Sequence, residues 1–387
     1  MKICIFTPFY TSGYGTGYSV QKEAEYLHKL GHDITVVHSE KNFKTPRNSN
    51  ISFFYFEYVN TPILNIYLMK RNIEKAIIKA TEQKKGFDVF YGQALEFGLI
   101  NFKILEEAPH IYFARSTIKG ARASCLKHGI RDGAGRMLIS FFLIFLEKRC
   151  LKNSKIIFVK SRIMQRELSQ LYKVNISKIK ILRGAIDKND FPLLSAQKKS
   201  KILKEVGLSM RGSIILYVGR ISPVKGIETL VKSFAEITRA GLSCTLLLVG
   251  GSMKRGKYYE KILRLIRNLN LENRVKIIGF VPQLEVYKYY NIADIVIIPS
   301  IYEPFGMVLY QALRYKKCII CTDVVGALES INPGENIKIL PAGSVHRMTE
   351  IMKDLLEGRR NASREYELIS WEDMTKQEDR IFKTFVE

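Results

Sequence analysis

The sequence predicts an α/β protein made of two doubly wound, Rossmann-like domains that face a central cleft. Short apolar runs alternate with helix-like stretches along most of the 387 residues, which is typical of parallel sheets covered by helices. A polar, Lys-rich stretch at 193–212 interrupts this alternation, which then starts again. The length also suggests two or three domains at about 150 residues each. We therefore place residues 1–192 in an N-terminal domain and residues 193–368 in a C-terminal domain.

The first half of the chain contains six strand-like apolar runs. Residues 118–136 are interpreted as a loop, because they carry four glycines among Lys and Arg residues. The expected strands are 2–7, 33–37, 50–60, 88–91, 110–113 and 155–159, and the expected helices are 20–30, 64–83, 98–107, 137–152 and 162–172.

The second half repeats the alternation of strand and helix. Its expected strands are 214–218, 244–249, 274–278, 295–298 and 318–321. Two expected helices follow the first two of these strands and end near residues 239 and 268. Four more are expected at 284–290, 307–315, 345–357 and 371–385. Two successive runs of βα repeats separated by a linker favour two domains over one large sheet.

Composition argues against several classes of protein. The longest apolar stretch, residues 137–146, falls well short of the ~20 residues that cross a bilayer. The apolar start of the chain ends at Pro8 without a small-residue cleavage site, so we interpret it as a buried strand. Most of the six cysteines lie in apolar runs, which is typical of core residues in a reducing compartment. No His/Cys cluster predicts a zinc site.

The net charge of +24 leaves three kinds of partner open, namely an anionic membrane surface, nucleic acid and anionic substrates. A solvated basic surface with no partner is the fourth reading. The amino-terminal half carries the larger share of the charge. Lys predominates over Arg, and no known nucleic-acid module is present, so we expect no nucleic-acid partner.

Three loops of the second half follow predicted strands and should reach one edge of one sheet. They contain Gly219 to Lys225, Gly250-Gly251, and Glu303 to Met307. Open α/β sheets bind ligands at the carboxyl ends of their strands. Arg220 and Lys225 supply two cations beside a helix amino terminus, which suits a diphosphate. Taken singly, each cation could equally be an ordinary surface residue, and Glu303 could be a helix-start carboxylate.

The glycine-rich turn at residues 12–19 is a weaker signal. It follows the first strand and opens the first helix, where Gly15 and Gly17 would let backbone N–H groups approach phosphate oxygens closely. Its spacing only approximates the dinucleotide-binding fingerprint, and no acidic residue closes the second strand.

Several motifs together resemble family 4 of the retaining glycosyltransferases, which have the GT-B fold. They are YVGRISPVKGIETL from residue 217, IIGFVP from 277, ADIVIIPSIYEPFG from 293, and VGALE ending at Glu329. The resemblance covers nearly the whole chain, including the helix that begins at Ser370 with SWEDM. It implies that residues 1–192 form the acceptor-side domain. It also implies that 193–368 bind the nucleotide sugar and that helix 369–387 crosses back to the first domain.

The resemblance also implies the roles of individual residues. Arg220 and Lys225 would hold and stabilise the leaving diphosphate, and Glu303 would contact the donor sugar or lie near the reacting centre. The other implied donor-binding residues are Gly15, Gly17, Gly219, Gly250, Phe280, Phe305, Gly306, Met307, Gln311 and Glu329. The implied reaction keeps the anomeric configuration and needs no metal. It also needs no cofactor beyond the nucleotide-sugar co-substrate.

Three positions depart from the family pattern. Val325 replaces the first glycine of the Gly-Gly-x-x-Glu segment that Glu329 closes. Gln311 stands eight positions after Glu303, where the family has a second Glu that accepts hydrogen bonds from the ribose. A glutamine keeps one carbonyl acceptor but loses the charge, which weakens such bonds. Arg115 stands where the family often has a His. Arg remains protonated, so it cannot act as a general base, and we assign it to the acceptor side as a candidate anion-binding residue.

The resemblance implies a retaining hexosyltransferase of cell-surface polysaccharide biosynthesis, which we expect to be cytoplasmic. We expect a glycan or a lipid-linked acceptor, and peripheral association with the inner face of an anionic membrane is a candidate property. The alternative is a non-catalytic GT-B subunit that binds sugar or nucleotide, which Gln311 and Arg115 would favour.

Overall fold

A computed structural model describes residues 1–10, 15–41, 43, 50–59, 65–105, 108–130, 134–208, 212–251, 256–358 and 365–384. The chain divides into two compact units. Unit 1 comprises Met1–Gly120, Arg131–Gly184 and Ile369–Glu387, and unit 2 comprises Ala121–Ile130 and Ala185–Leu368. The predicted boundaries of independent domains stay predictions.

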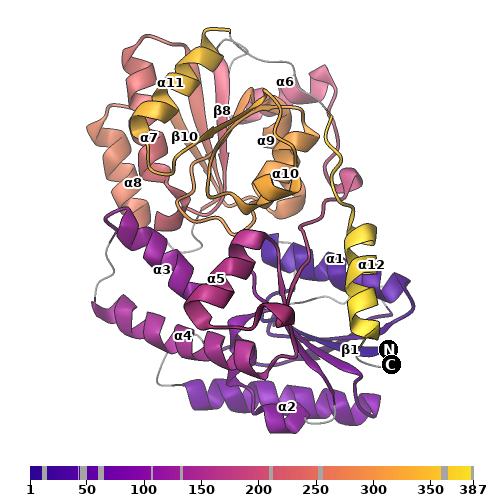
Figure 1. Ribbon diagram of the computed structural model, residues 1–387. Coiled ribbons are helices and arrows are strands. Elements are labelled where there is room, and N and C mark those ends of the chain that lie inside the picture. The colour runs from indigo at the N-terminus through magenta and orange to yellow at the C-terminus, as the bar shows by residue number, and fades with distance from the viewer. Residues whose placement is uncertain are drawn as a thin grey trace. The chain divides into compact units, whose positions relative to one another are not determined.

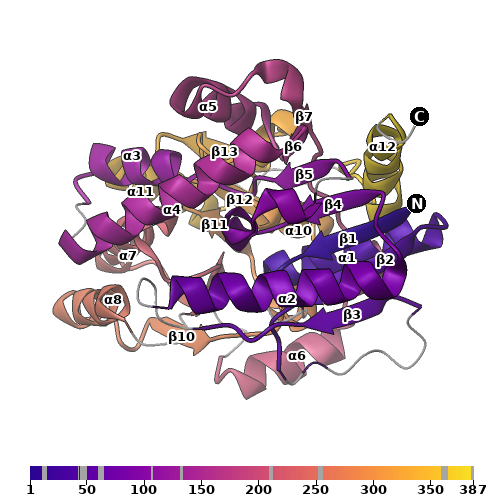
Figure 2. The ribbon, with the colours of Figure 1, turned by 90° about the horizontal axis from the view of Figure 1, so that it is seen from below.

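Figure 1 shows the ribbon of the chain. The described residues of unit 1 form a seven-stranded parallel sheet in the order β3-β2-β1-β4-β5-β6-β7, whose strands are labelled in Figure 2. The strands are β1 (Lys2–Phe6), β2 (Asp33–His38), β3 (Ser52–Tyr55), β4 (Val89–Gly92), β5 (His110–Phe113), β6 (Ile156–Val159) and β7 (Ile179–Ile181). The chain winds outward from β1 on both sides, so the order reverses between β1 and β4. Ligand sites of doubly wound sheets lie at such a switch point.

Helices cover both faces of this sheet, and strand β1 shows why. Successive side chains of a strand point to opposite faces. Ile3 and Ile5 share a core with α1 (Gly15–Lys29), whereas Cys4 and Phe6 share one with α2 (Ile66–Lys84), α4 (Ala134–Asn153) and α5 (Arg162–Tyr172). In Figure 2, α2 and α4 run across one face of the sheet. Burial on both faces explains why the strands read as continuous apolar runs.

The C-terminal helix α12 (Trp371–Lys383) belongs to unit 1 and packs beside α1. Trp371 is fully buried with its ring edge-on to Tyr18, the ring centroids 6.0 Å apart, and Phe382 packs on Tyr91. Asp379 accepts a hydrogen bond from Nε2 of His32 at 2.8 Å. The helix therefore closes the same face of the sheet that α1 covers.

Unit 2 contains a six-stranded parallel sheet in the order β10-β9-β8-β11-β12-β13. Its strands are β8 (Ser213–Val218), β9 (Cys244–Val249), β10 (Val275–Gly279), β11 (Ile295–Ile298), β12 (Cys318–Thr322) and β13 (Ile337–Leu340). Its helices are α6 (Ala196–Glu205), α7 (Ile227–Arg239), α8 (Lys257–Asn268), α9 (Tyr287–Ile292), α10 (Met307–Arg314) and α11 (Val345–Leu356). The chain again reverses direction across the sheet, here between β8 and β11.

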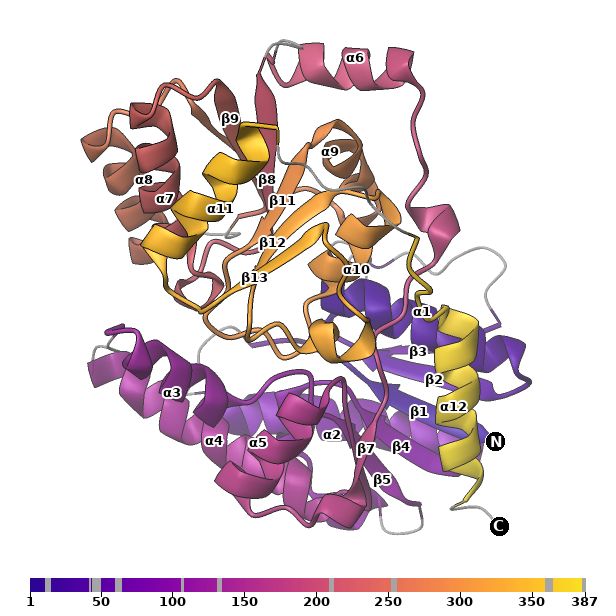
Figure 3. The same ribbon diagram turned by 45° about the horizontal axis from the view of Figure 1, so that its top comes forward.

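In unit 2, α7, α8 and α11 lie on one face of the sheet and α9 and α10 on the other (Figure 3). Ile215 and Tyr217 of β8 share the core of the first face with Phe234 of α7 and Met352 of α11. Strands β7 and β13 were not predicted, because a lysine interrupts each short apolar run, Lys180 in β7 and Lys338 in β13. The predicted class, two Rossmann-like α/β units, is confirmed.

One predicted loop is wrong. Within residues 118–136, the structure has helix α3 (Ile118–Lys127) and the start of α4. Thr117 caps α3, since its Oγ1 accepts a hydrogen bond from the backbone N–H of Gly120 at 3.0 Å. Gly120 is buried, and an added Cβ would collide with the side chain of Glu167. This glycine therefore serves close helix packing rather than a loop.

Helix α4 contains the longest apolar stretch of the chain. Within the described ranges, none of the helices combines the length and the apolar character that crossing a bilayer requires.

Candidate active site

The switch point of unit 2 brings together the loops that follow β8 and β11. Backbone N–H groups of Ile301 and Tyr302 donate hydrogen bonds to the carbonyl oxygen of Val224, at 2.9 and 3.2 Å. This joins the loop after β11 to the short 3₁₀ turn Pro223–Lys225 that precedes α7. Two of the three loops expected at one edge of one sheet are therefore in contact.

Lys225 and Glu303 form an ion pair at this edge. Nζ of Lys225 lies 2.5 Å from Oε2 of Glu303, and the two side chains are 19% and 12% exposed. The Ser300 hydroxyl donates to the same carboxylate oxygen at 3.1 Å. The carbonyl of Ser300 in turn accepts a bond from Thr322 at 2.7 Å. Residues that follow several strands thus fix the position of the Glu303 carboxylate.

The predicted sugar-binding segment, residues 303–307, is joined to the short helix Gly326–Ser330. Gly326 N–H donates to the carbonyl of Glu303 at 3.0 Å, and Ala327 N–H donates to that of Phe305 at 2.7 Å. Gly306 caps α10 with a φ of 94°, and Met307 is the first residue of that helix. Glu329 is exposed on the short helix.

Arg220 and the glycine loops lie at the ends of β8 and β9. Arg220 is exposed, and its carbonyl accepts a hydrogen bond from the buried Tyr217 hydroxyl at 2.7 Å. The N–H of Gly219 donates a hydrogen bond to the carbonyl oxygen of Val249 at 2.9 Å. The N–H of Gly250 donates one to the carbonyl oxygen of Gly279 at 2.8 Å. A Cβ on Gly250 would stand 2.2 Å from the Gly219 carbonyl oxygen, so these two loops require a glycine at 250 to approach so closely.

Gln311 lies in the interior, 3% exposed, on α10. Its Oε1 accepts a hydrogen bond from the hydroxyl of Tyr290 at 2.9 Å. The Tyr290 ring stacks on Tyr315 with the centroids 5.4 Å apart, and burial raises the pKa of Tyr290 well above its usual value. The one carbonyl acceptor that Gln311 keeps is therefore already engaged by a tyrosine. Its contact with a nucleotide stays a prediction.

Phe280 follows β10 and is 49% exposed. It borders a hollow of about 680 Å³, which is lined by parts of α6, β10 and α9. A ring open to solvent at the carboxyl end of a strand can stack on a planar group. The predicted base-binding role of Phe280 is compatible with this position and is not tested by it.

Unit 1 places Gly15 and Gly17 in the first turn of α1, Gly15 exposed and Gly17 buried. The Ser19 hydroxyl donates to the carbonyl of Gly15 at 3.0 Å and tightens this turn. Residues 11–14 of the predicted glycine-rich turn lie outside the described residues.

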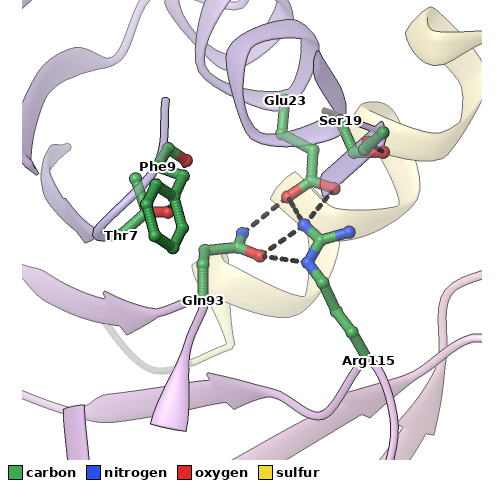
Figure 4. Close-up of polar contacts among 7 residues, drawn as sticks. Thr7, Phe9, Ser19, Glu23, Gln93 and Arg115 are labelled. Carbon is green, nitrogen blue, oxygen red and sulfur yellow. Dashed lines mark hydrogen bonds and ion pairs between the residues drawn. The ribbon is translucent and has the colours of Figure 1, made fainter. Parts of the chain in front are cut away.

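Arg115, two residues after β5, lies in a polar cluster (Figure 4). Its Nη2 lies 3.0 and 3.2 Å from the carboxylate oxygens of Glu23, a buried residue of α1. Its Nε and Nη2 also donate to Oε1 of Gln93, at 3.2 and 2.5 Å, and Nε2 of Gln93 donates to Glu23 at 2.6 Å. Gln93 directly follows β4, so this cluster lies at the switch point of unit 1.

Residues 198–367, which run from α6 to beyond α11, match the family model described as glycosyl transferases group 1. The predicted resemblance to a glycosyltransferase family is confirmed at this level.

Curated relatives match part of the chain. An uncharacterised glycosyltransferase of Methanocaldococcus jannaschii is 28% identical over 236 residues, which is 59% of each chain. The chain thus matches about three-fifths of that relative's length.

Solved structures show the fold of the entire chain. Sucrose-phosphate synthase of Thermosynechococcus elongatus superposes with a TM-score of 0.79 at 19% identity, covering 99% of this chain and 98% of that one. HepE of Anabaena, solved with UDP and glucose, superposes with a TM-score of 0.73 at 16% sequence identity. The match covers 99% of this chain and 100% of HepE.

Sequence reasoning missed Glu23 and Gln93, the partners of Arg115, and three further residues near it in unit 1. Lys160 directly follows β6 and is 6% exposed, and Glu378 of α12 and Tyr91 of β4 are fully buried. Burial, followed by the charge of Arg115, lowers the pKa of Lys160 to about 7. Burial and then the carboxylate of Glu23 raise the pKa of Glu378 well above its usual value. Lys160 could have been identified from the sequence, because it directly follows a predicted strand. Glu378 lies within a helix pattern and has no such local signal.

Across the described parts of the chain, no group of three or more His, Cys, Asp or Glu side chains could hold a metal ion. The predicted metal independence stays a prediction.

Proposed function

We propose that the protein is a retaining glycosyltransferase that moves a sugar from a nucleotide-sugar donor to a glycan or lipid-linked acceptor in cell-surface polysaccharide biosynthesis. The observation that supports this most is the Lys225–Glu303 pair at the switch point of a group 1 glycosyl transferase domain. A cation and a carboxylate 2.5 Å apart can bind a diphosphate and a sugar hydroxyl side by side.

In the proposed reaction, the bond between the sugar anomeric carbon and the diphosphate oxygen breaks. The acceptor hydroxyl oxygen bonds to that carbon on the same face, and the hydroxyl proton passes to the departing diphosphate. Arg220 and Lys225 stabilise the negative charge that develops on this leaving group, aided by the N–H groups that begin α7. Glu303 accepts hydrogen bonds from donor-sugar hydroxyls, and the backbone N–H groups of residues 305–307 supply donors.

Nucleotide sugars form the first test. HepE of Anabaena has been solved with UDP-glucose, so a UDP-sugar is the donor to try first, followed by ADP-, GDP- and TDP-sugars. We expect release of nucleoside diphosphate above background with at least one donor, measured by a coupled assay. Product NMR should show the anomeric configuration retained. An inverted product would refute the retaining mechanism.

The alternative, a non-catalytic binding subunit, makes a different prediction in the same experiment. Calorimetry would then detect nucleotide binding while no donor is turned over. No binding and no turnover with any donor would reject both functions.

A peripheral membrane contact is a second proposal, supported by the surface of α4. Four of its apolar side chains are 43–63% exposed, namely Met137, Leu138, Phe141 and Phe145. The same helix carries Lys148, Arg149 and Lys152, and neighbouring α2 exposes Tyr67 and Leu68. Exposed apolar side chains flanked by cations suit an anionic bilayer surface.

The membrane proposal predicts co-sedimentation with vesicles that contain 30% anionic lipid and little with neutral vesicles. Phe141→Ser/Phe145→Ser should reduce the bound fraction about tenfold or more, because each change removes roughly 1.5–3 kcal/mol of apolar transfer energy. Ile176→Ser is the matched control, since Ile176 is 56% exposed in unit 1 but lies away from α4 in the chain. Equal binding of the double variant and the control would contradict the proposal.

A further inference from the structure

Lys225 and Glu303 are brought together by the backbone as well as by their charges. The carbonyl oxygen of Val224 accepts hydrogen bonds from the N–H groups of Ile301 and Tyr302, at 2.9 and 3.2 Å. The turn that ends at Lys225 is thereby bonded to the loop that leads to Glu303. The approach of Lys225 Nζ to Glu303 Oε2, at 2.5 Å, is therefore built into the fold of unit 2.

The carboxylate of Glu303 has a second donor, the hydroxyl of Ser300, which lies 3.1 Å from the same Oε2. The backbone of Glu303 is fixed as well, since its carbonyl oxygen accepts a hydrogen bond from the N–H of Gly326 at 3.0 Å. Both side chains of the ion pair are mostly buried, so solvent and salt screen their attraction less than that of a surface pair. Lys225 therefore has a counter-ion that other residues hold in place.

An anion that binds Lys225 meets this carboxylate at short range. An ammonium group has three donors, so a phosphate oxygen can bond to Nζ beside Glu303. At a hydrogen-bond length of about 2.8 Å from Nζ, that oxygen would lie within roughly 5–6 Å of Oε2. Like charges at this separation disfavour each other. Glu303 should thus weaken the binding of a diphosphate to Lys225.

The strength of this competition changes during the proposed reaction. While the sugar is attached to the diphosphate, its hydroxyls donate hydrogen bonds to Glu303, and these bonds offset the repulsion. After transfer, the nucleoside diphosphate no longer carries that sugar. The carboxylate and the product then compete directly for Nζ of Lys225.

We propose that Glu303 promotes release of the nucleoside diphosphate product by competing with it for Lys225. The timing of this effect rests on the proposed glycosyltransferase function, whereas the competition needs only a diphosphate bound at Lys225. Product release limits the turnover of many enzymes, so a competitor for the leaving group that is part of the site raises turnover.

Glu303→Gln tests the competition, because it removes the charge but keeps the size and one carbonyl acceptor. UDP and inorganic pyrophosphate are the probes, since pyrophosphate carries the two phosphates without a base or a sugar. Calorimetry should show that Glu303→Gln binds each probe about tenfold or more tightly than the wild type, the value of one hydrogen bond to a charged group. Stopped-flow displacement of UDP should show a matching fall in koff.

Glu236→Gln is the matched control. Glu236 lies on α7 of the same unit and pairs with Arg239 at 2.5 Å, but both side chains are exposed. This change removes the same charge from the domain and should leave both affinities within twofold of wild type. A disturbed loop at residue 303 would weaken binding, so tighter binding identifies the lost charge as the cause.

Equal or weaker binding of either probe by Glu303→Gln would overturn the inference. An undiminished gain from Glu303→Gln in a Lys225→Met background would also overturn it, because the competition would then not be for Lys225. No binding of either probe to any of these proteins would instead reject the diphosphate site on which the proposed function depends. The assay uses no sugar donor, so it stays measurable if nucleotide-sugar turnover fails.

Discussion

Arg220→Ala and Lys225→Ala should each lower kcat/KM for sugar transfer by about 10²–10³, the range seen when one group that stabilises a developing negative charge is removed. Lys225 is the more informative of the two. It lies 2.5 Å from Glu303 at the carboxyl edge of unit 2, so its loss also leaves a carboxylate that is 12% exposed without its cation. The measurement is initial rates with saturating acceptor over a range of donor concentrations.

Lys232→Ala is the control for this pair of variants. Lys232 is exposed on α7, the helix that Lys225 precedes, and it should keep the wild-type rate. Rates within twofold of wild type for Arg220→Ala and Lys225→Ala would reject their assignment to the diphosphate. A change in KM alone would show that they bind the donor without stabilising the leaving group.

Gly226→Ala should destabilise unit 2 by about 2–5 kcal/mol, the range of the severe backbone and packing substitutions. Gly226 has a φ of 64° between Lys225 and α7. A Cβ at this position would stand 1.9 Å from the carbonyl oxygen of Pro299, a backbone atom in the loop after β11. Relieving that clash would separate the two loops that carry Lys225 and Glu303, so transfer activity should fall as well.

Gly241→Ala is the control that separates the steric clash at Gly226 from the cost of a positive φ. Gly241 also has a positive φ, 76°, but nothing lies within 4 Å of the point that a Cβ would occupy there. Gly241→Ala should therefore cost only the conformational penalty, roughly 1–2 kcal/mol. Differential scanning calorimetry of both variants gives the comparison. Equal shifts of the melting temperature would contradict a steric role for Gly226.

Most strands were readable from the sequence, because parallel strands buried on both faces form continuous apolar runs such as 295–298. Helix α3 and the short strands β7 and β13 were not. The position of Lys225 and Glu303 near one edge was also readable, since residues that follow parallel strands reach the same side of the sheet. The cap by Thr117 was missed, although its hydroxyl-bearing side chain before a helix is a local signal that could have been used.

The partners of individual side chains were decided only by tertiary structure. Gln311 stood out in the sequence as a missing carboxylate, and only the packing of α9 on α10 shows that Tyr290 donates to it. The cluster at Arg115 joins residues 92 positions apart, Glu23 and Arg115, and a helix from the end of the chain supplies Glu378. Apolar periodicity specifies which face of an element is buried, because burial depends on each element alone. The pairing and protonation of polar groups depend on which elements become neighbours, and no local pattern encodes that.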